Sequence, residues 1–517
     1  MSLLPLAALG GLLTLGACTM GPNWQRPDSP GRFSYQAPAG QPAPSQASEK
    51  PLPVNWWDIF GDPELSSLER RAVSANLDVQ EATARFAQSR AAARITGADR
   101  YPSIGGNASY TRERASPNGI LSLLGTTQQQ SASTVANGTG FGPSGLPGSG
   151  GSPPFDLWQY GVDASWELDL WGRVRREMEA ANAETEASAD MRRGILVSVL
   201  VETARDYLLL RGVQAQIAIT RQNLDIAEHS LALTRLRLQN GATTDLDVAN
   251  AGAAVSTIKA SLPGLISRQA ELVNALSFLL AEPPRALETE LGTPRPIPPA
   301  PPVVPVGLPS ELAEQRPDIR AAEAQLHAAT AEIGVAKADF YPKITLGGSL
   351  DIQALQFTGL GSWGSRQYGF GPAISLPIFE GGRLRGTLEL RKAQQRQAAI
   401  AYQRTVLQAW REVDDALTAY NAVQNQRSQL EDAVKQNETA LKTAREQYAQ
   451  GATDFLNVLT VQGRLLDSQQ SLVQATTATS MAVTSLYAAL GGGWQQVFPV
   501  SSGMQTASAI AEAAGQR

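Results

Sequence analysis

The sequence has few of the residues on which most chemical sites depend. Its 517 residues include one cysteine and two histidines. A single cysteine excludes an intramolecular disulfide framework, and this content argues against a thiolate- or imidazole-rich metal site. Acidic residues outnumber basic ones, giving a net charge of -5, and no basic tail is present. This balance argues against nucleic acid as the main partner.

The sequence also lacks a long hydrophobic run and has few aromatic residues. No apolar stretch approaches the roughly 20 residues of a membrane-spanning helix. That absence does not exclude a membrane protein, because membrane-spanning β-strands leave only a weak trace in hydropathy. Ala, Gln, Leu and Arg are abundant instead, a bias typical of long helices.

The N-terminus has the pattern of an export signal followed by a lipid attachment site. An apolar run over residues 3–15 leads to Leu-Gly-Ala-Cys, in which Cys18 is the only cysteine. This resembles a bacterial lipobox, which implies a covalent lipid on Cys18, and Thr19 implies sorting to the outer membrane. The alternative is a cysteine buried in a hydrophobic helix, against which Gly21-Pro22 argues. No Lys or Arg precedes the apolar run, which points to a start codon further upstream.

The chain contains two copies of one unit. Asp78 and Asp318 lie in matching positions 240 residues apart, whereas the Gly-Ala-Thr motifs at 241 and 451 are 210 apart. The offset changes because the first copy carries about thirty extra residues, visible as a low-complexity run at 116–154. The expected organisation is a signal peptide at 1–17, a lipidated N-terminal tether at 18–60, repeat 1 at 61–282, a Pro-rich linker at 283–309, repeat 2 at 310–490 and a C-terminal tail at 491–517.

Each repeat is predicted to contain a β-hairpin, over 103–171 in the first copy and 343–380 in the second. Apolar and polar residues alternate in segments of about ten, which is typical of transmembrane strands with one face on lipid and one on water. Aromatic residues near the strand ends fit an interfacial girdle: Tyr160, Trp166, Trp171, Tyr341 and Tyr368. A soluble sheet with one face on a core gives the same alternation and is the alternative.

The remainder of each repeat is predicted to be helical. A helix of about thirty residues opens each copy, and two helices of about 68 residues follow the hairpins, at 173–240 and 383–450. At about 1.5 Å per residue each long helix reaches on the order of 100 Å. Apolar residues seven apart, such as Leu224, Leu231 and Leu238, indicate a supercoiled seam. A glycine turn and a returning helix follow each long helix. The alternative interpretation of these helices is an ordinary soluble coiled coil.

Three patterns that look like chemical motifs do not indicate chemistry. The glycines at 140–145 match a dinucleotide-binding motif but lie in low-complexity sequence, without a preceding strand or following helix. Ser256 and Lys259 match a serine acyl-enzyme motif whose companion motifs are absent. His229 and His327 lie in predicted helices. No enzyme, and neither a metal nor any cofactor besides the lipid, is expected.

Several motifs, taken in order, resemble the outer-membrane factor family, the TolC-like, NodT-type efflux lipoproteins of tripartite pumps. They are N-W-W-D-I-F-G-D-P-E-L at 55–65, W-E-L-D-L-W-G-R at 166–173, R-P-D-I at 316–319, F-Y-P at 340–342 and the turn at 451–461. The resemblance implies a homotrimer with a β-barrel in the outer membrane and a helical tunnel across the periplasm. It also implies a periplasmic adaptor (membrane fusion) protein and an inner-membrane resistance-nodulation-division pump as partners.

The residues themselves require an oligomer, because four strands cannot close a barrel and lipid does not tolerate open strand edges. Two chains give eight strands and a filled barrel, and three give twelve strands with room for a channel. The family resemblance implies three chains. The expected fold is therefore an α+β membrane protein: a trimeric 12-stranded outer-membrane β-barrel continuous with a long periplasmic α-helical barrel, with internal duplication.

The turns after the long helices are the predicted functional site. In the family these turns form the entrance and contact the adaptor. The matching positions are Gly241, Ala242, Thr243, Asp245, Leu246, Val248, Gly451, Ala452, Thr453, Asp454, Leu456 and Val458. The purely structural interpretation is that the glycines end the long helices, while Thr243, Thr453 and Asp454 cap the returning ones. Both roles are compatible.

Leu456, Asp454 and Asp247 are the gate candidates. Relatives narrow the entrance with a hydrophobic ring and an Asp ring one helical turn later; Leu456 fits the first, but Thr460 stands at the second. Asp245, Asp247 and Asp454 offer negative charge instead. The expected function is passive conduction of small molecules from pump and adaptor to the exterior. A duct for type I protein secretion and a lipid-anchored periplasmic scaffold are the alternatives.

Overall fold

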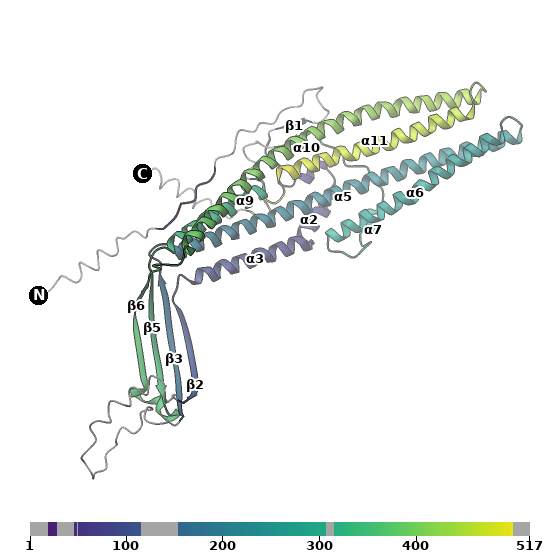
Figure 1. Cartoon of the computed structure of the whole chain (residues 1–517). Coiled ribbons are helices and arrows are strands. Elements are labelled where there is room, and N and C mark those ends of the chain that lie inside the picture. The colour runs from purple at the N-terminus through teal and green to yellow at the C-terminus, as the bar shows by residue number, and fades with distance from the viewer. Residues whose placement is uncertain (1–18, 28–45, 49, 115–153, 307–314, 500–517) are drawn as a thin grey trace, which may run out of the picture. The chain divides into compact units, whose positions relative to one another are not determined.

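The computed structural model describes residues 19–27, 46–48, 50–114, 154–306 and 315–499 (Figure 1). The chain divides into two compact units. The first comprises residues 1–24, 92–181 and 329–394 and contains a four-stranded sheet. The second comprises residues 25–91, 182–328 and 395–517 and is mostly helical.

The sheet of the first unit is antiparallel, with the strand order β2-β3-β5-β6. Its strands are β2 (Ser103–Glu113), β3 (Phe155–Leu168), β5 (Lys343–Ala354) and β6 (Arg366–Ser375). All four lie within the two hairpins predicted from the sequence. Because β3 pairs with β5, the hairpins of the two repeats join into one sheet.

The strand register sorts the side chains by polarity, as the alternation predicts. One face carries apolar rows that cross all four strands: Ile104, Ala164, Gly348 and Phe370, then Gly106, Val162, Leu350 and Tyr368. The opposite face carries small and polar rows, such as Gly105, Asp163, Ser349 and Gly369. Successive residues of a strand point to opposite faces, so this register is what separates the two sets.

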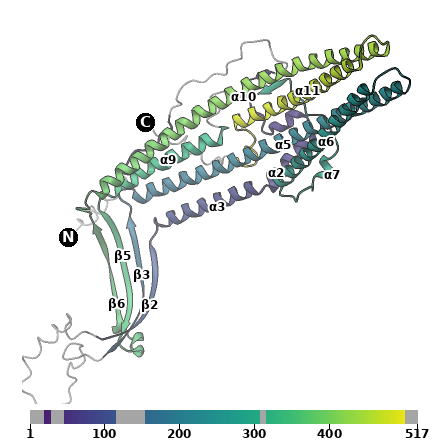
Figure 2. The ribbon, with the colours of Figure 1, turned by 45° about the vertical axis from the view of Figure 1, so that its right-hand side comes forward.

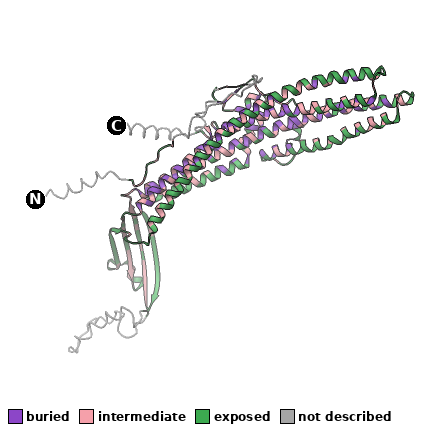
Figure 3. Cartoon of the chain, turned by 45° about the horizontal axis from the view of Figure 1, so that its top comes forward, coloured by how far each residue is buried: buried purple, intermediate pink, exposed green. Residues whose placement is uncertain are grey.

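Both faces of the sheet are open within the described part of the chain. No residue of the four strands is buried (Figure 3). Ile104 is 76% exposed and Phe370 is 86% exposed. Among the described residues, β2 and β6 are hydrogen-bonded to a strand on one side only. An apolar face and two open edges of this kind require cover from lipid or from another chain.

Two long helical hairpins run side by side in the second unit (Figures 1 and 2). Helices α5 (Arg173–Gln239) and α10 (Arg383–Ala449) have 67 residues each, close to the predicted length. Helices α6 (Asp245–Leu279) and α11 (Phe455–Leu490) return from their ends. No helix among the described residues is apolar over enough of its length to cross a bilayer.

The main core of the second unit lies between the long helical hairpins and two other parts of the chain, the segment around η1 and α2 at residues 56–75 and the segment around α7 and β4 at residues 288–305. The short 3-10 helix η1 (Trp56–Phe60) buries three aromatic residues there, and the Trp56 ring stacks on Tyr487 at 5.4 Å. Helix α2 (Pro63–Ala75) adds Leu65 and Leu68, both fully buried. The predicted tether at 18–60 therefore ends inside the core rather than before it, because burial of these large rings stabilises the fold.

The helix opening repeat 1 is shorter than predicted. The predicted helices with Asp78 and Asp318 in their opening turns are α3 (Leu77–Ala98) and α9 (Pro317–Ala338), and both have 22 residues rather than about thirty. Asn76 separates α3 from the preceding α2: its side chain accepts hydrogen bonds from the N–H groups of Asp78 and Val79. A side chain that caps the next helix in this way interrupts the preceding one.

The predicted tether and linker also contain short paired segments. Strand β1 (Gln46–Ser48) pairs in parallel with β4 (Val303–Pro305), and α7 (Glu288–Leu291) lies in the linker. Two further 3-10 helices, η4 (Phe357–Gly361) and η5 (Trp363–Ser365), connect β5 to β6. The predicted low-complexity loop and the C-terminal residues after 499 lie outside the described residues.

Candidate functional site

Each long helix ends in a glycine turn at the tip of its hairpin. Gly241 has φ +74 and Gly451 has φ +77, a left-handed conformation that glycine adopts without steric cost. The Ala242 N–H donates to the Arg237 carbonyl at 2.9 Å, and the Ala452 N–H donates to the Gln447 carbonyl at 2.8 Å. These bonds satisfy carbonyls that a helix end leaves free. The two turns therefore have the same construction.

The first returning helix is capped by Thr244, one residue after the predicted Thr243. The Asp247 N–H donates to Thr244 Oγ1, and the Thr244 N–H donates to the Asp247 carboxylate, which is a capping box. Thr243 instead donates its hydroxyl to Asp247 Oδ2 at 2.6 Å. These hydroxyl and backbone bonds, with Thr243 contributing most, lower the pKa of Asp247. The charged carboxylate of Asp247 therefore stabilises the turn.

The second returning helix is capped by Asp454, as the sequence allowed. Its carboxylate accepts the Asn457 N–H at 2.9 Å, and Asn457 Nδ2 donates to the Thr453 hydroxyl at 3.1 Å. Thr460 donates its hydroxyl to the Leu456 carbonyl within the helix. Thr460 is therefore a neutral residue satisfied by its own backbone, and it supplies no acidic ring.

A compact apolar cluster, here called the tip cluster, lies beneath the turns. It draws buried residues from all four helices of the hairpins: Ala227, Leu231, Ala251, Val255, Val434, Leu441, Ala444, Phe455, Val458 and Leu465. Polar contacts join the helices around it: Lys259 pairs with Glu228 at 2.6 Å, and the Arg237 guanidinium lies 4.3 Å from the centre of the Tyr448 ring. The two hairpins are thus fastened to each other near their tips.

The predicted tip residues divide into exposed and packed sets. Leu246 is 68% exposed and Leu456 is 58% exposed, although both are large and apolar. Val458 is buried in the tip cluster and Val248 packs against it, so both side chains serve the fold. The other exposed positions are Gly241, Ala242, Asp245, Gly451, Ala452 and Asp454, while Thr243, Asp247 and Thr453 are half-buried. The exposed set, and Leu246 with Leu456 above all, is available to a partner.

A second feature is the docking of the N-terminal segment Thr19–Trp24, here called the strap, in the first unit. The Met20 N–H donates to the Trp171 carbonyl at 3.1 Å, and Arg176 donates to the Met20 carbonyl and to Asn23 Oδ1. A Cβ at Gly334 would lie 2.7 Å from the Met20 carbonyl oxygen. Only glycine leaves room for the strap at this position.

Neither Arg176 nor Gly334 was predicted from the sequence as a functional residue. The available signal was a glycine within a predicted helix, which costs about 1 kcal/mol relative to alanine and so suggests a packing role. Beside the strap, the Trp171 ring stacks on Tyr341 at 4.8 Å, so two predicted girdle residues are in contact. Cys18, the predicted lipid site, lies outside the described residues and directly precedes the strap.

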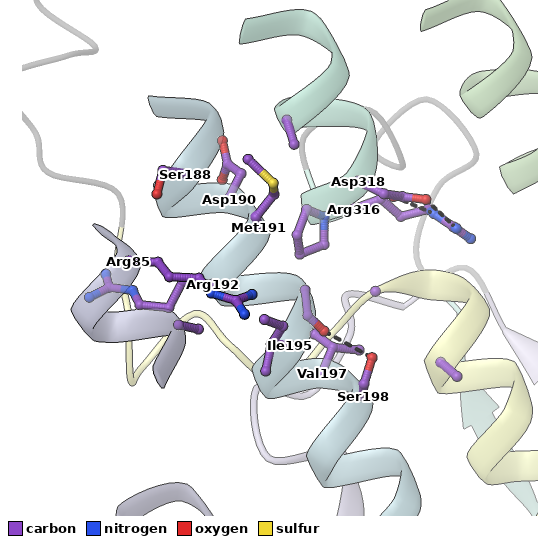
Figure 4. Close-up of a pocket in the computed structure, with 16 residues that line it drawn as sticks. Arg85, Ser188, Asp190, Met191, Arg192, Ile195, Val197, Ser198, Arg316 and Asp318 are labelled. Carbon is purple, nitrogen blue, oxygen red and sulfur yellow. Dashed lines mark hydrogen bonds and ion pairs between the residues drawn. The ribbon is translucent and has the colours of Figure 1, made fainter. Parts of the chain in front are cut away.

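The second unit also contains a cavity of about 590 Å³ lined by α3, α5, α9 and α11 (Figure 4). Among its charged groups, Arg316 pairs with Asp318 and Glu412, and Asp190 pairs with Arg193 and Arg320. Met191 and Ile195 contribute apolar surface. The described residues include no group of three or more His, Cys, Asp or Glu side chains placed to hold a metal ion.

The sequence is similar to known outer-membrane proteins over most of its length. The family model "outer membrane efflux protein" matches residues 68–282 and 308–492. The chain belongs to this family. It is 32% identical to the outer membrane protein OprJ of Pseudomonas aeruginosa, covering 94% of this chain and 95% of that protein. It is also 32% identical to the solvent efflux pump outer membrane protein SrpC of Pseudomonas putida, covering 93% and 97%.

A solved structure shows the same architecture. The outer-membrane channel OprN superimposes with a TM-score of 0.80 at 31% identity, covering 92% of this chain and all of that chain. The family resemblance noted in the sequence is thus confirmed. This outer membrane efflux protein lies in the outer membrane and belongs to a family of transport channels rather than enzymes.

Proposed function

We propose that this chain forms, as a homotrimer, the outer-membrane conduit of a tripartite efflux system. The observation that carries the proposal is the four-stranded sheet, with its exposed apolar face and its two open edges. Four strands cannot close a barrel, and an open edge in lipid leaves backbone groups without hydrogen bonds. Three copies supply twelve strands, enough to enclose a channel, whereas eight strands enclose only side chains.

The conduit is passive. The tips described above form its periplasmic entrance, where a periplasmic adaptor protein docks and an inner-membrane resistance-nodulation-division pump delivers cargo. Leu456 is the constricting residue, and the acidic residues Asp454 and Asp247 give the entrance a negative potential that favours cations. No step requires a cofactor, and the only covalent addition is lipid on Cys18, which directly precedes the docked strap.

Small molecules are the proposed cargo. The relative SrpC is named for a solvent efflux pump, which supports drugs and other toxic compounds over secreted proteins. The pump selects the substrate in such a system, and the outer-membrane component passes it on. A type I protein-secretion duct and a lipid-anchored scaffold are the competing functions.

The first experiment is native mass spectrometry of the detergent-extracted protein, followed by conductance in planar bilayers. We expect three copies per particle and a channel conductance that the heat-denatured protein does not give. A stable monomer without conductance would exclude a conduit and favour the scaffold. Urea extraction of membranes provides a second readout, because a scaffold held by one lipid anchor is stripped more easily than an inserted barrel.

A further inference from the structure

The internal duplication relates the helices of the two repeats with single-residue accuracy. Helix α5 begins at Arg173 and α10 at Arg383, 210 residues later, and both have 67 residues. Helix α3 begins at Leu77 and α9 at Pro317, 240 residues later, and both have 22 residues. Within the chain, α9 of the second repeat packs on α5 of the first, as the ion pair of Arg320 with Asp190 shows. The equivalent neighbour of α10 is an α3, and this chain's own α3 packs on α5, where the Arg192 guanidinium lies 4.5 Å from the Phe86 ring centre.

Burial along α5 and α10 differs at equivalent positions. Ala180 is 2% exposed and Val197 is 8% exposed, whereas their counterparts Leu390 and Leu407 are 55% and 53% exposed. Position 190 is also buried, and its counterpart Ile400 is 53% exposed. The residues of α10 on this side are the larger and more apolar ones, yet they lack the cover that their counterparts have. A surface of this kind is suited to a protein partner.

The strap lies against Arg176 of α5 and Gly334 of α9, and this place is here called the strap slot. It has a counterpart on α10 in which the arginine and the glycine are exchanged. Arg176 on α5 corresponds to Gly386 on α10, and Gly334 on α9 corresponds to Arg94 on α3. In the strap slot an ideal Cβ on Gly334 is 2.7 Å from Arg176 Cγ, so the arginine lies directly across the glycine. At Gly386 an added Cβ meets no described atom within 4 Å, and Arg94 is exposed.

A charged partner for Arg94 lies at the matching place. In the strap slot, Arg176 Nη1 donates to Glu179 at 2.7 Å. The counterpart of Glu179 is Glu389, which is exposed on α10 one turn after Gly386. An arginine reaching over Gly386 from a neighbouring α3 would therefore meet a carboxylate. Long arginine side chains bury their stems against such small residues while the guanidinium forms the ion pair.

We propose that helix α3 of a second copy covers this face of α10, with its Arg94 lying across Gly386 and paired with Glu389. The same exchange accounts for the difference between the two slots: the first holds the strap, and the second is filled by the neighbouring copy's arginine. Each copy contributes α3 to one contact and α10 to the other, so the interface is head-to-tail and repeats around a closed ring. The inference rests on the trimer proposed above and specifies its interface.

Disulfide cross-linking tests this contact in the full-length protein in membranes. In the strap slot an ideal Cβ on Gly334 lies 2.7 Å from Arg176 Cγ, so the two equivalent positions face each other at close range. A disulfide joins Cβ atoms about 3.8 Å apart. The double variant Arg94→Cys/Gly386→Cys is expected to give covalent trimers on non-reducing gels, which reductant converts to monomers. Each single variant is expected to give no covalent trimer. The matched pair Gln88→Cys/Gly386→Cys, in which the α3 cysteine lies six residues before position 94, is also expected to give none.

A steric exchange gives an independent readout. Gly386→Leu is expected to lower the melting temperature of the assembled particle, and adding Arg94→Gly is expected to restore part of it, because the leucine then fills the vacated space. If native mass spectrometry finds trimers but the cysteine pair does not cross-link and the two substitutions are simply additive, this interface is wrong while the conduit stands. If the particle is a monomer, both proposals fall.

Discussion

Leu246 and Leu456 occupy the same place in the two copies of the helical hairpin, 210 residues apart, and both are exposed. Each follows its helix cap by two residues, so the cap fixes the direction in which the side chain points. Exposed leucines at a hairpin tip are unfavourable in isolation. Their presence is consistent with an assembly in which they meet one another or a partner.

The first prediction concerns the gate. Leu456→Ser is expected to raise the conductance of the closed trimer in planar bilayers, because a smaller polar residue relieves a hydrophobic constriction that excludes water. Leu246→Ser is the matched control, since it removes the same side chain from the other hairpin. Equal, unchanged conductance in both variants would exclude Leu456 as the gate.

The second prediction concerns pH at the first tip. The pKa of Asp247 is lowered by the Thr243 and Thr244 hydroxyls. A lowered folded-state pKa stabilises the turn above the unfolded value of about 3.9, and that contribution is lost as pH falls through the folded value. Acidification below about pH 4 is therefore expected to fray the start of α6.

Hydrogen exchange of the amides at 245–248, corrected for intrinsic rates, measures this fraying. Asp247→Asn is the comparison variant, because it removes the titrating group and leaves an amide that still accepts hydrogen bonds. The wild-type protein should approach the variant's exchange as the pH falls. An identical acid response in both proteins would show that other carboxylates control this turn.

At the scale of elements, the strap joins the N-terminus to the junction of sheet and helices in the first unit. It contacts the start of α5 through Arg176 and the C-terminal part of α9 through Gly334, residues far apart in sequence. Gly21 has φ +98, and a Cβ there would lie 2.5 Å from Gly334 Cα. Two glycines thus allow the strap backbone to lie directly on a helix.

The third prediction follows from this contact. Gly334→Val is expected to expel the strap, because the added side chain occupies the space of the Met20 carbonyl. Limited proteolysis should then cut within residues 19–24, which the wild-type protein protects. Gly97→Val is the control, since the nearest atom to a Cβ there is Met178 Cε at an ordinary 3.9 Å. Equal protection in both variants would mean that the strap is held by other contacts.

At the scale of the whole molecule, the chain has surfaces that it cannot cover by itself. The apolar face of the sheet, its open edges and the exposed side of α10 all lack cover among the described residues. The second unit does have a substantial core of its own around Trp56, Tyr207 and Tyr487. Within that core, Tyr207 donates to Asp62 at 2.6 Å. Assembly is therefore expected to complete the surface rather than the core.

The sequence by itself predicted the features that depend on local periodicity. Alternation over 160–170 gave a strand with one apolar face, and the matching motifs at 241 and 451 placed both tips within a residue or two. These predictions succeed because side-chain direction repeats every two residues in a strand, and because a glycine ends a helix wherever φ must be positive.

Only the tertiary structure decided the features that depend on contacts between distant segments. Asn76 caps the start of α3 while its side chain also donates to the Leu279 carbonyl, and Thr244 rather than Thr243 caps α6. The strap slot exists because Arg176 and Gly334 meet across more than 150 residues of chain. A one-dimensional pattern records which way a side chain points but not what it meets, so partners of this kind emerge only when the elements pack.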